Sequence, residues 1–132
     1  MNHYGKHALI RLTPAQQKFV DEVSQNIYRP CCDNSTHFPD CNHGMAMLGL
    51  LELMASQGKS ESEMYKAALT MNSYWFPQQY QTIAAYFASN GTRWRDVSPK
   101  EILGKAYSSA SGYGRIAALM QSKESRGSRC SV

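Results

Sequence analysis

The stretch NHGMAMLGLLELMASQ, from Asn42 to Gln57, gives the clearest indication of the fold. Its leucines and methionines fall on nearly every side of a helix, and Gly58 is a typical residue just past a helix end. A helix that is apolar all round normally runs through the middle of a protein, so we expect this one at the centre of a helical bundle. Its one carboxylate, Glu52, we expect on a narrow solvent-exposed edge, because buried carboxylates are rare.

Signals for the start and end of other helices lie on both sides of this stretch. The tetrapeptides TPAQ, SESE and SPKE, which begin at Thr13, Ser60 and Ser98, are capping boxes that predict helix N-termini. Pro77 should end or kink the helix that begins at Ser60, and no alternating run rich in Val, Ile and Thr predicts a strand. We therefore predict an all-α fold: a four-helix bundle with a Cys/His-rich loop between the first two helices and a short helical C-terminal extension.

The helix expected after Ser60 has apolar residues at intervals of three and four, which predicts one buried face. We expect that face to comprise Met64, Ala67, Ala68, Met71, Tyr74 and Trp75. The aromatic residues from Tyr74 to Tyr86 are interpreted mainly as core, with a pocket or an electron path beside the Cys/His loop as the alternative.

The length of 132 residues indicates one domain, large enough to form a hydrophobic core without disulfide or metal staples. We predict that residues 1–122 form a single helical metal-binding domain. Residues 123–132, a polar segment that contains Cys130, are predicted to be a disordered basic tail. No apolar run reaches the length of a transmembrane helix.

The charge and the N-terminus restrict partners and compartment only in part. The net charge of +4 is not arranged as a basic stripe interleaved with aromatic residues, so nucleic acid is not an expected partner. The N-terminus has no apolar signal core. We expect a cytoplasmic location if Met1 is the native start, and a periplasmic one if a signal segment was trimmed.

Chemically reactive residues are concentrated in YRPCCDNSTHFPDCNHG, from Tyr28 to Gly44, which holds three of the four cysteines. An odd number of cysteines fits a disulfide scaffold badly. The three thiols and one imidazole of Cys31, Cys32, Cys41 and His43 are the usual four ligands of a zinc ion or a two-iron cluster. Cys41 and His43 also lie at the expected N-terminus of the next helix, where backbone N–H groups favour thiolate over thiol.

Within this loop, CCDNSTHFPDCNHG resembles the binding loop of the CDGSH-type iron–sulfur proteins, the mitoNEET family, which holds a [2Fe–2S] cluster with three Cys and one His. Cys32, Ser35, Pro39 and Cys41 follow that family's spacing. The resemblance implies Cys32 and Cys41 as cluster ligands. This chain differs in having a cysteine directly before Cys32, and a histidine two residues after Cys41 where the family has four. The family's fold is β-rich, so we interpret the likeness as convergence on one loop chemistry.

Other polar residues of the loop are expected around the ligands. We predict that Ser35 and Asn34 contribute to cofactor binding by donating hydrogen bonds to the sulfurs, which tunes potential and stability. Asp33, His37 and Asp40 are alternative ligands, but in so turn-rich a segment we interpret them as turn or solvated residues.

Four functions are consistent with this ligand set. The leading interpretation is a [2Fe–2S] protein for electron transfer, cluster transfer or redox sensing, acting with an unidentified redox or metal-delivery partner protein. One alternative is a structural Zn²⁺ site, and another is Cu⁺ binding or delivery, because Met45 and Met47 follow His43 and thioethers suit soft Cu⁺. The last is a thiol-based redox enzyme with Cys31 or Cys32 as nucleophile; no Gly-framed nucleophile motif or phosphate loop supports it.

Overall fold

The computed structural model describes residues 11–38 and 41–131, with the backbone alone described from residue 124. Over those residues the protein is all-α, as predicted, with seven α-helices and one 3₁₀ turn. These are α2 (Pro14–Ser24), α3 (Asn42–Ser56), α4 (Glu61–Trp75), α5 (Pro77–Ser89), η1 (Trp94–Asp96), α6 (Pro99–Leu103), α7 (Lys105–Ser108) and α8 (Ala110–Ser131). The β pairing in this part of the chain is one isolated bridge between Tyr28 and Ser35. None of the described helices is both long and apolar enough to cross a membrane.

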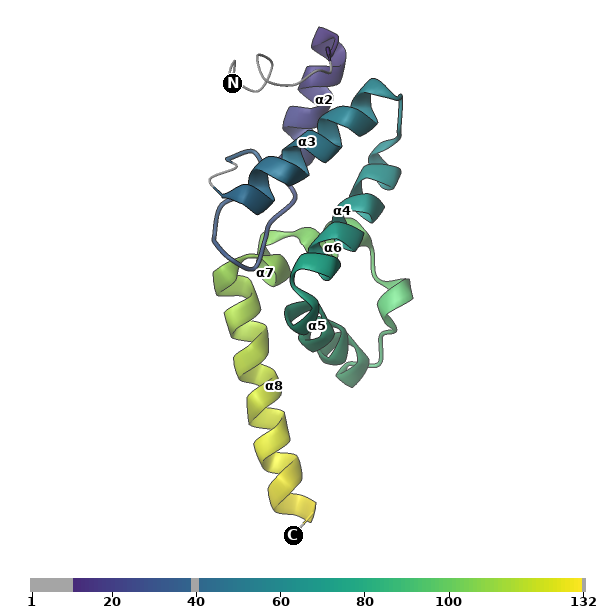
Figure 1. Cartoon of the computed structure of the whole chain (residues 1–132). Coiled ribbons are helices and arrows are strands. Elements are labelled where there is room, and N and C mark those ends of the chain that lie inside the picture. The colour runs from purple at the N-terminus through teal and green to yellow at the C-terminus, as the bar shows by residue number, and fades with distance from the viewer. Residues whose placement is uncertain (1–10, 39–40, 132) are drawn as a thin grey trace.

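The helices pack around two hydrophobic cores. The first lies between α2, α3 and α4, and the second between α5 and the first half of α8 (Figure 1). The short helix α6 joins them, since Leu103 is fully buried in the first core and its neighbour Ile102 in the second. The all-α class is therefore confirmed, whereas the finer prediction of a four-helix bundle is not confirmed.

Local signals set the ends of most helices. The capping boxes at Thr13 and Ser60 form with both reciprocal hydrogen bonds, and Pro77 ends α4 and begins α5. Gly58 follows α3 with a φ of 75°, a left-handed conformation that favours glycine. The third predicted box is wrong: Ser98 precedes the five-residue helix α6 but makes no side-chain capping bond to it.

The position of α3 differs from the expectation of a central helix. One face, which includes Met47 and Leu51, is fully buried, but Met45 and Leu53 on the other side are 43% and 41% exposed. Apolar residues all round the helix do not show how many neighbours cover it, and here α2 and α4 cover one side only. Tyr74 of α4 is a second correction, since it is 79% exposed and not part of the buried face.

Glu52 is buried, with 7% of its surface exposed, which corrects the prediction of a solvent-exposed edge. It lies one helical turn before Ala55 and one after Leu48, on the face that packs against α2. Burial, and then the nearby carboxylate of Asp21 on α2, raise the pKa of Glu52.

Helix α8 begins beside the Cys/His loop and continues to Ser131, pointing away from the rest of the molecule (Figure 1). Its first turns are held by Tyr113, Ile116 and Met120 in the second core. The helix continues through the backbone of residues 123–131, whereas the sequence predicts a disordered tail over residues 123–132. The segment has no proline to stop a helix that tertiary packing has started. The side chain of Cys130 lies outside the described residues.

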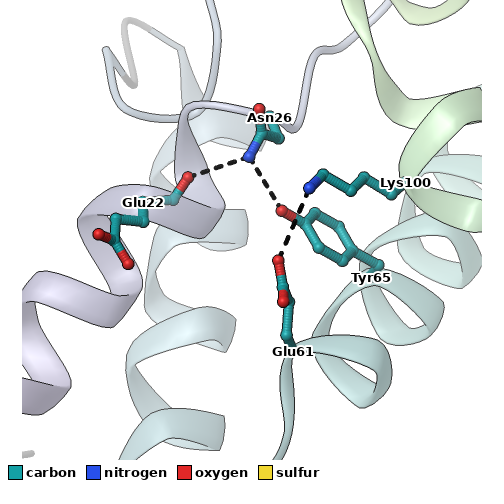
Figure 2. A network of polar contacts seen from close by, with 5 residues as sticks. All are labelled: Glu22, Asn26, Glu61, Tyr65 and Lys100. Carbon is teal, nitrogen blue, oxygen red and sulfur yellow. Dashed lines mark hydrogen bonds and ion pairs between the residues drawn. The ribbon is translucent and has the colours of Figure 1, made fainter.

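A polar network connects α2, α4 and α6 on one side of the first core (Figure 2). The Asn26 side-chain amide donates to the backbone oxygen of Glu22 at 3.3 Å and to the Tyr65 hydroxyl at 3.1 Å. Lys100 of α6 lies 3.8 Å from the Glu61 carboxylate and over the Tyr65 ring. This network holds the end of α2, from which the Cys/His loop departs.

Candidate metal centre

The loop between α2 and α3 is closed at its base by backbone pairing. The Thr36 N–H and hydroxyl both donate to the backbone oxygen of Ile27, at 2.8 and 3.0 Å. The Tyr28 N–H donates to the Leu103 oxygen of α6 at 2.9 Å. Ile27 and Thr36 are both fully buried, so the segment between them is held as a turn against the helices.

A series of hydrogen bonds between buried polar side chains stabilises the base of this loop. The fully buried Asn72 amide donates to the Tyr28 oxygen at 2.9 Å and to the Tyr80 hydroxyl at 3.0 Å. The Tyr80 and Ser108 hydroxyls lie 2.7 Å apart. Burial raises the pKa of Tyr80 to about 12, so it stays a neutral hydroxyl that can both donate and accept.

Cys32 and Asp33 accept hydrogen bonds from the N-terminus of α8. The Ala110 N–H donates to the Cys32 backbone oxygen at 2.7 Å, and the Ser111 N–H donates to the Asp33 carboxylate at 2.8 Å. Those two N–H groups belong to the first turn of α8, which has no intrahelical partner for them. Asp33 thus caps α8, a contact that its prediction as a turn or solvated residue did not include.

Cys41 caps the other helix that meets the loop. It is the N-cap residue of α3, and its sulfur accepts a hydrogen bond of 3.4 Å from the Gly44 N–H. The Cys31 and Cys41 sulfurs lie 3.9 Å apart. Together with a ring nitrogen of His43 they form a group whose ligand atoms all lie within 4.8 Å of one another.

This spacing suits a single metal ion. Two sulfurs bound to one tetrahedral zinc at about 2.3 Å each lie about 3.8 Å apart, close to the separation in this site. The chain matches no protein-family model, no curated protein and no solved structure at a significant level. Support for metal binding therefore comes from the group formed by Cys31, Cys41 and His43 alone.

Two aromatic residues orient the imidazole of His43. Its ring centroid lies 5.0 Å from that of Trp75, at the end of α4, and 5.0 Å from that of Phe76, between α4 and α5. Both aromatic side chains are partly buried, so they restrict the imidazole on one side of the site. The sequence places both near a helix end and allows them beside the loop, but it does not show that they contact His43.

Cys32, the fourth predicted ligand, is not in the three-residue group. Its sulfur accepts a hydrogen bond of 3.2 Å from the guanidinium of Arg29, which also donates to the Thr36 hydroxyl at 3.3 Å. Arg29 is fully buried, and sequence reasoning missed it because a lone arginine in a loop is normally solvated. The role of Cys32 as a ligand remains a prediction.

The charge of Arg29 acts on all three loop thiols. Burial alone lowers the pKa of this guanidinium, but the neighbouring Cys32, Cys41 and Cys31 sulfurs outweigh it and the pKa is raised. Arg29 therefore stays charged and supplies a fixed positive charge where metal ligands must be thiolates.

The two sulfurs of the group differ in acidity. Burial, followed by the neighbouring Cys41 and Cys32 sulfurs, raises the pKa of Cys31 to about 11. Burial also opposes ionisation of Cys41, but the Gly44 N–H and the Arg29 charge outweigh it, so its pKa is lowered. Cys41 is therefore the first of the pair to become a thiolate, and a metal ion must displace the proton of Cys31.

The two residues predicted to donate hydrogen bonds to sulfur have other contacts in the structure. The Ser35 hydroxyl accepts a hydrogen bond of 3.3 Å from the His37 N–H, and its side chain is buried. The Asn34 backbone oxygen lies 3.6 Å from the Cys32 sulfur as an acceptor. Their role in cofactor binding stays a prediction. Asp40 lies outside the described residues.

A second feature of the surface is a pair of adjoining grooves beside the network of Figure 2, with volumes of about 620 and 240 Å³. Ser98 and Lys100 line both grooves. Their charged lining residues are two lysines and two glutamates, Lys100, Lys105, Glu61 and Glu101. Neither groove has a thiol or an imidazole among its lining residues, so they are separate from the Cys/His group.

Proposed function

We propose that this protein binds one thiophilic metal ion per chain through Cys31, Cys41 and His43, and that Zn²⁺ is the ion favoured by this ligand set. The observation that carries the proposal is the approach of the three ligand atoms to within 4.8 Å, with the two sulfurs 3.9 Å apart. Two cysteines and one histidine, with a fourth position left for an exchangeable ligand, are a known zinc arrangement.

The exposure of the site favours exchange of the ion over a purely structural role. Cys31 is exposed, and Cys41 and His43 are partly exposed, so a partner molecule can reach the ion. The buried cores contain none of the three residues. We therefore propose metal exchange with a partner protein that offers competing thiolate or imidazole ligands.

The [2Fe–2S] cluster is the second candidate, and a specific observation favours it. Two positive groups contact the loop thiols: the buried guanidinium of Arg29, which donates to the Cys32 sulfur, and the N-terminus of α3, whose Gly44 N–H donates to the Cys41 sulfur. Such surroundings stabilise an anionic cluster. A cluster needs a fourth ligand, so Cys32 would have to leave Arg29 and turn toward Cys31 and Cys41.

A Cu⁺ site has weaker support. Met47 is fully buried in the first core, where its sulfur is part of the packing between helices. Met45 is 43% exposed and is the one methionine of the pair that a metal can approach. Two thiolates and one thioether suit Cu⁺, so this ion remains an outcome of the metal analysis.

Metal analysis and absorption spectroscopy of anaerobically purified protein test the proposal. One equivalent of zinc and a colourless protein support it, and replacement by Co²⁺ should give the strong visible bands of a tetrahedral cobalt–thiolate site. Red-brown protein with two iron atoms per chain would show the cluster instead. The Cys41→Ser variant should lose stoichiometric metal while Cys130→Ser keeps it. Equal metal content in wild type and Cys41→Ser contradicts the proposed site.

A further inference from the structure

The sulfurs of Cys31 and Cys41 are close enough for a second kind of chemistry. They lie 3.9 Å apart, and neither sulfur is part of a disulfide bond. A disulfide bond is about 2.0 Å long, so the sulfurs need to approach by about 1.9 Å to form one. The Cys31 side chain is exposed, so rotation about its side-chain bonds can supply a movement of this size without disturbing a packed core.

Cys32 is a poorer partner for either of these sulfurs. Adjacent Cα atoms are about 3.8 Å apart across a trans peptide, whereas disulfides normally join Cα atoms roughly 4.4–6.8 Å apart. No cis peptide bond occurs among the described residues, so a bond between Cys31 and Cys32 would require a distorted backbone. The Cys32 sulfur is in addition not a member of the group in which the Cys31 and Cys41 sulfurs lie close together.

We infer that Cys31 and Cys41 form a two-electron dithiol–disulfide couple, and that their disulfide and the metal ion are alternative states of the same two sulfurs. The couple itself follows from the position of the sulfurs in the metal-free chain. The exchange with metal rests on the proposed function, because it needs both sulfurs to be ligands of the ion.

A peroxide is the oxidant that this exposed pair can use. The Cys41 thiolate attacks one oxygen of hydrogen peroxide, the O–O bond breaks, Cys41 becomes a sulfenic acid, and the departing hydroxide takes up a proton to form water. The Cys31 sulfur then attacks the Cys41 sulfur as the Cys31 thiol loses its proton; the S–S bond forms, the S–O bond breaks, and the departing hydroxide takes up that proton. In total the two thiols lose two electrons and two protons, and one hydrogen peroxide is reduced to two waters.

Oxidation removes two of the three proposed ligands at once. The ion is then held by His43 alone, which is too few ligands for a stable zinc site, so it leaves. Reduction of the disulfide by a thiol restores the ligands. The same two sulfurs thereby couple the metal content of the protein to peroxide.

Peptide mapping after peroxide treatment tests the inference. A Cys130→Ser background removes the remaining cysteine, and Cys31→Ser, Cys32→Ser and Cys41→Ser are each added to it. Circular dichroism checks that every variant is helical. Apo and Zn²⁺-loaded samples are treated with hydrogen peroxide, free thiols are alkylated, and released zinc is measured with a chromogenic chelator.

Cleavage before aspartate separates the sulfurs, because Asp33 and Asp40 lie between them in the chain. Fragment 21–32 carries Cys31 and Cys32, and fragment 40–95 carries Cys41. We expect a cross-link between these fragments that survives Cys32→Ser and is lost in Cys31→Ser and in Cys41→Ser, with one zinc released per cross-link.

Three results overturn the inference: no cross-link between the two fragments, a cross-link that persists in Cys31→Ser, or zinc that stays bound after the cross-link has formed. A different result separates it from the proposed function. If the apo protein forms the expected cross-link but never binds zinc, the metal proposal fails while the dithiol–disulfide couple stands.

Discussion

The Ser111 N–H donates a hydrogen bond of 2.8 Å to the carboxylate of Asp33, which lies 78 residues earlier in the chain. The neighbouring Ala110 N–H donates to the Cys32 backbone oxygen at 2.7 Å. Two N–H groups in the first turn of the longest helix, α8, are thus satisfied by the loop that carries the metal ligands. The position of Cys31 and Cys32 therefore depends on a contact distant in sequence as well as on the loop itself.

The first prediction concerns this cap. Asp33→Ala should lower the melting temperature at neutral pH, because the first turn of α8 loses its carboxylate acceptor. The Ser111 N–H and then the Ser111 side chain lower the pKa of Asp33 in the folded protein. Its contribution to stability is therefore present above the unfolded pKa of about 3.9 and is lost as the pH falls through the folded pKa.

Thermal melts of Asp33→Ala and wild type between pH 7 and pH 2 check this expectation, with Asp96→Ala as the control. Asp96 is an exposed carboxylate whose ion pair with Arg93 at 3.1 Å is solvated, so its loss should have little effect. A difference between wild type and Asp33→Ala that does not shrink at low pH would show that the carboxylate charge is not what stabilises α8.

The second prediction concerns Arg29. Arg29→Met keeps most of the buried volume but removes the positive charge beside the loop thiols, so it should weaken zinc binding by roughly 10–100-fold, the range typical of groups that support metal ligands. Arg29→Lys keeps the charge and should lose less. Competition with a chromogenic chelator at pH 7 measures both affinities. Equal affinities for Arg29→Met and wild type would mean that the charge does not act on the ligands.

The third prediction separates packing from metal ligation by the two methionines after His43. Met47→Ala should cost about 2–5 kcal/mol of unfolding free energy, because it leaves a cavity in the first core. Its zinc affinity should be unchanged in the protein that remains folded. Met45→Ala, on the exposed side of α3, should change stability by less than about 0.5 kcal/mol. Loss of bound copper in Met45→Ala, with zinc binding intact, would point to a thioether ligand.

The fourth prediction concerns the buried carboxylate on α3. Burial and the Asp21 carboxylate raise the pKa of Glu52 in the folded state above its unfolded value, so ionised Glu52 destabilises the fold. Glu52→Gln should therefore raise the melting temperature at pH 7. The gain should be complete above the folded pKa and should disappear below the unfolded one, where wild-type Glu52 is protonated in both states. Thermal melts at pH 7 and pH 4 measure it; a stabilisation that is equal at both pH values would argue against a charge effect.

Features that depend on local sequence could be predicted, and those that depend on tertiary contacts could not. The capping boxes at Thr13 and Ser60 use residues three positions apart, so the sequence contains the whole interaction. The exposed side of α3, the exposure of Tyr74 and the burial of Glu52 depend on which helices lie alongside, which apolar spacing does not report.

The same distinction between local sequence and tertiary contacts applies to the candidate site. Cys31, Cys41 and His43 were predicted together because they lie within one loop, and the structure brings their ligand atoms together. Arg29 was missed because its burial requires the closure of the loop between Ile27 and Thr36. The contacts of His43 with Trp75 and Phe76 join residues more than thirty positions apart, and no pattern in the sequence indicates them.

The last prediction concerns the dependence of the fold on the metal. Neither hydrophobic core includes Cys31, Cys41 or His43. The loop is closed at its base by hydrogen bonds from Thr36 to Ile27, and it is attached to α8, without any metal–ligand bond. The apo protein should therefore keep its helices.

Metal should still stabilise the folded state, because the unfolded chain does not hold the three ligands together. Binding to the folded state alone adds about 3–4 kcal/mol at a hundred to a thousand times the dissociation constant. Chelated protein, with its thiols kept reduced, should thus show an unchanged helical circular dichroism signal at 25 °C and a lower but still cooperative melting transition. Loss of the helical signal on chelation would mean that the ion organises the whole chain, and a structural zinc site would then explain the protein better than an exchangeable one.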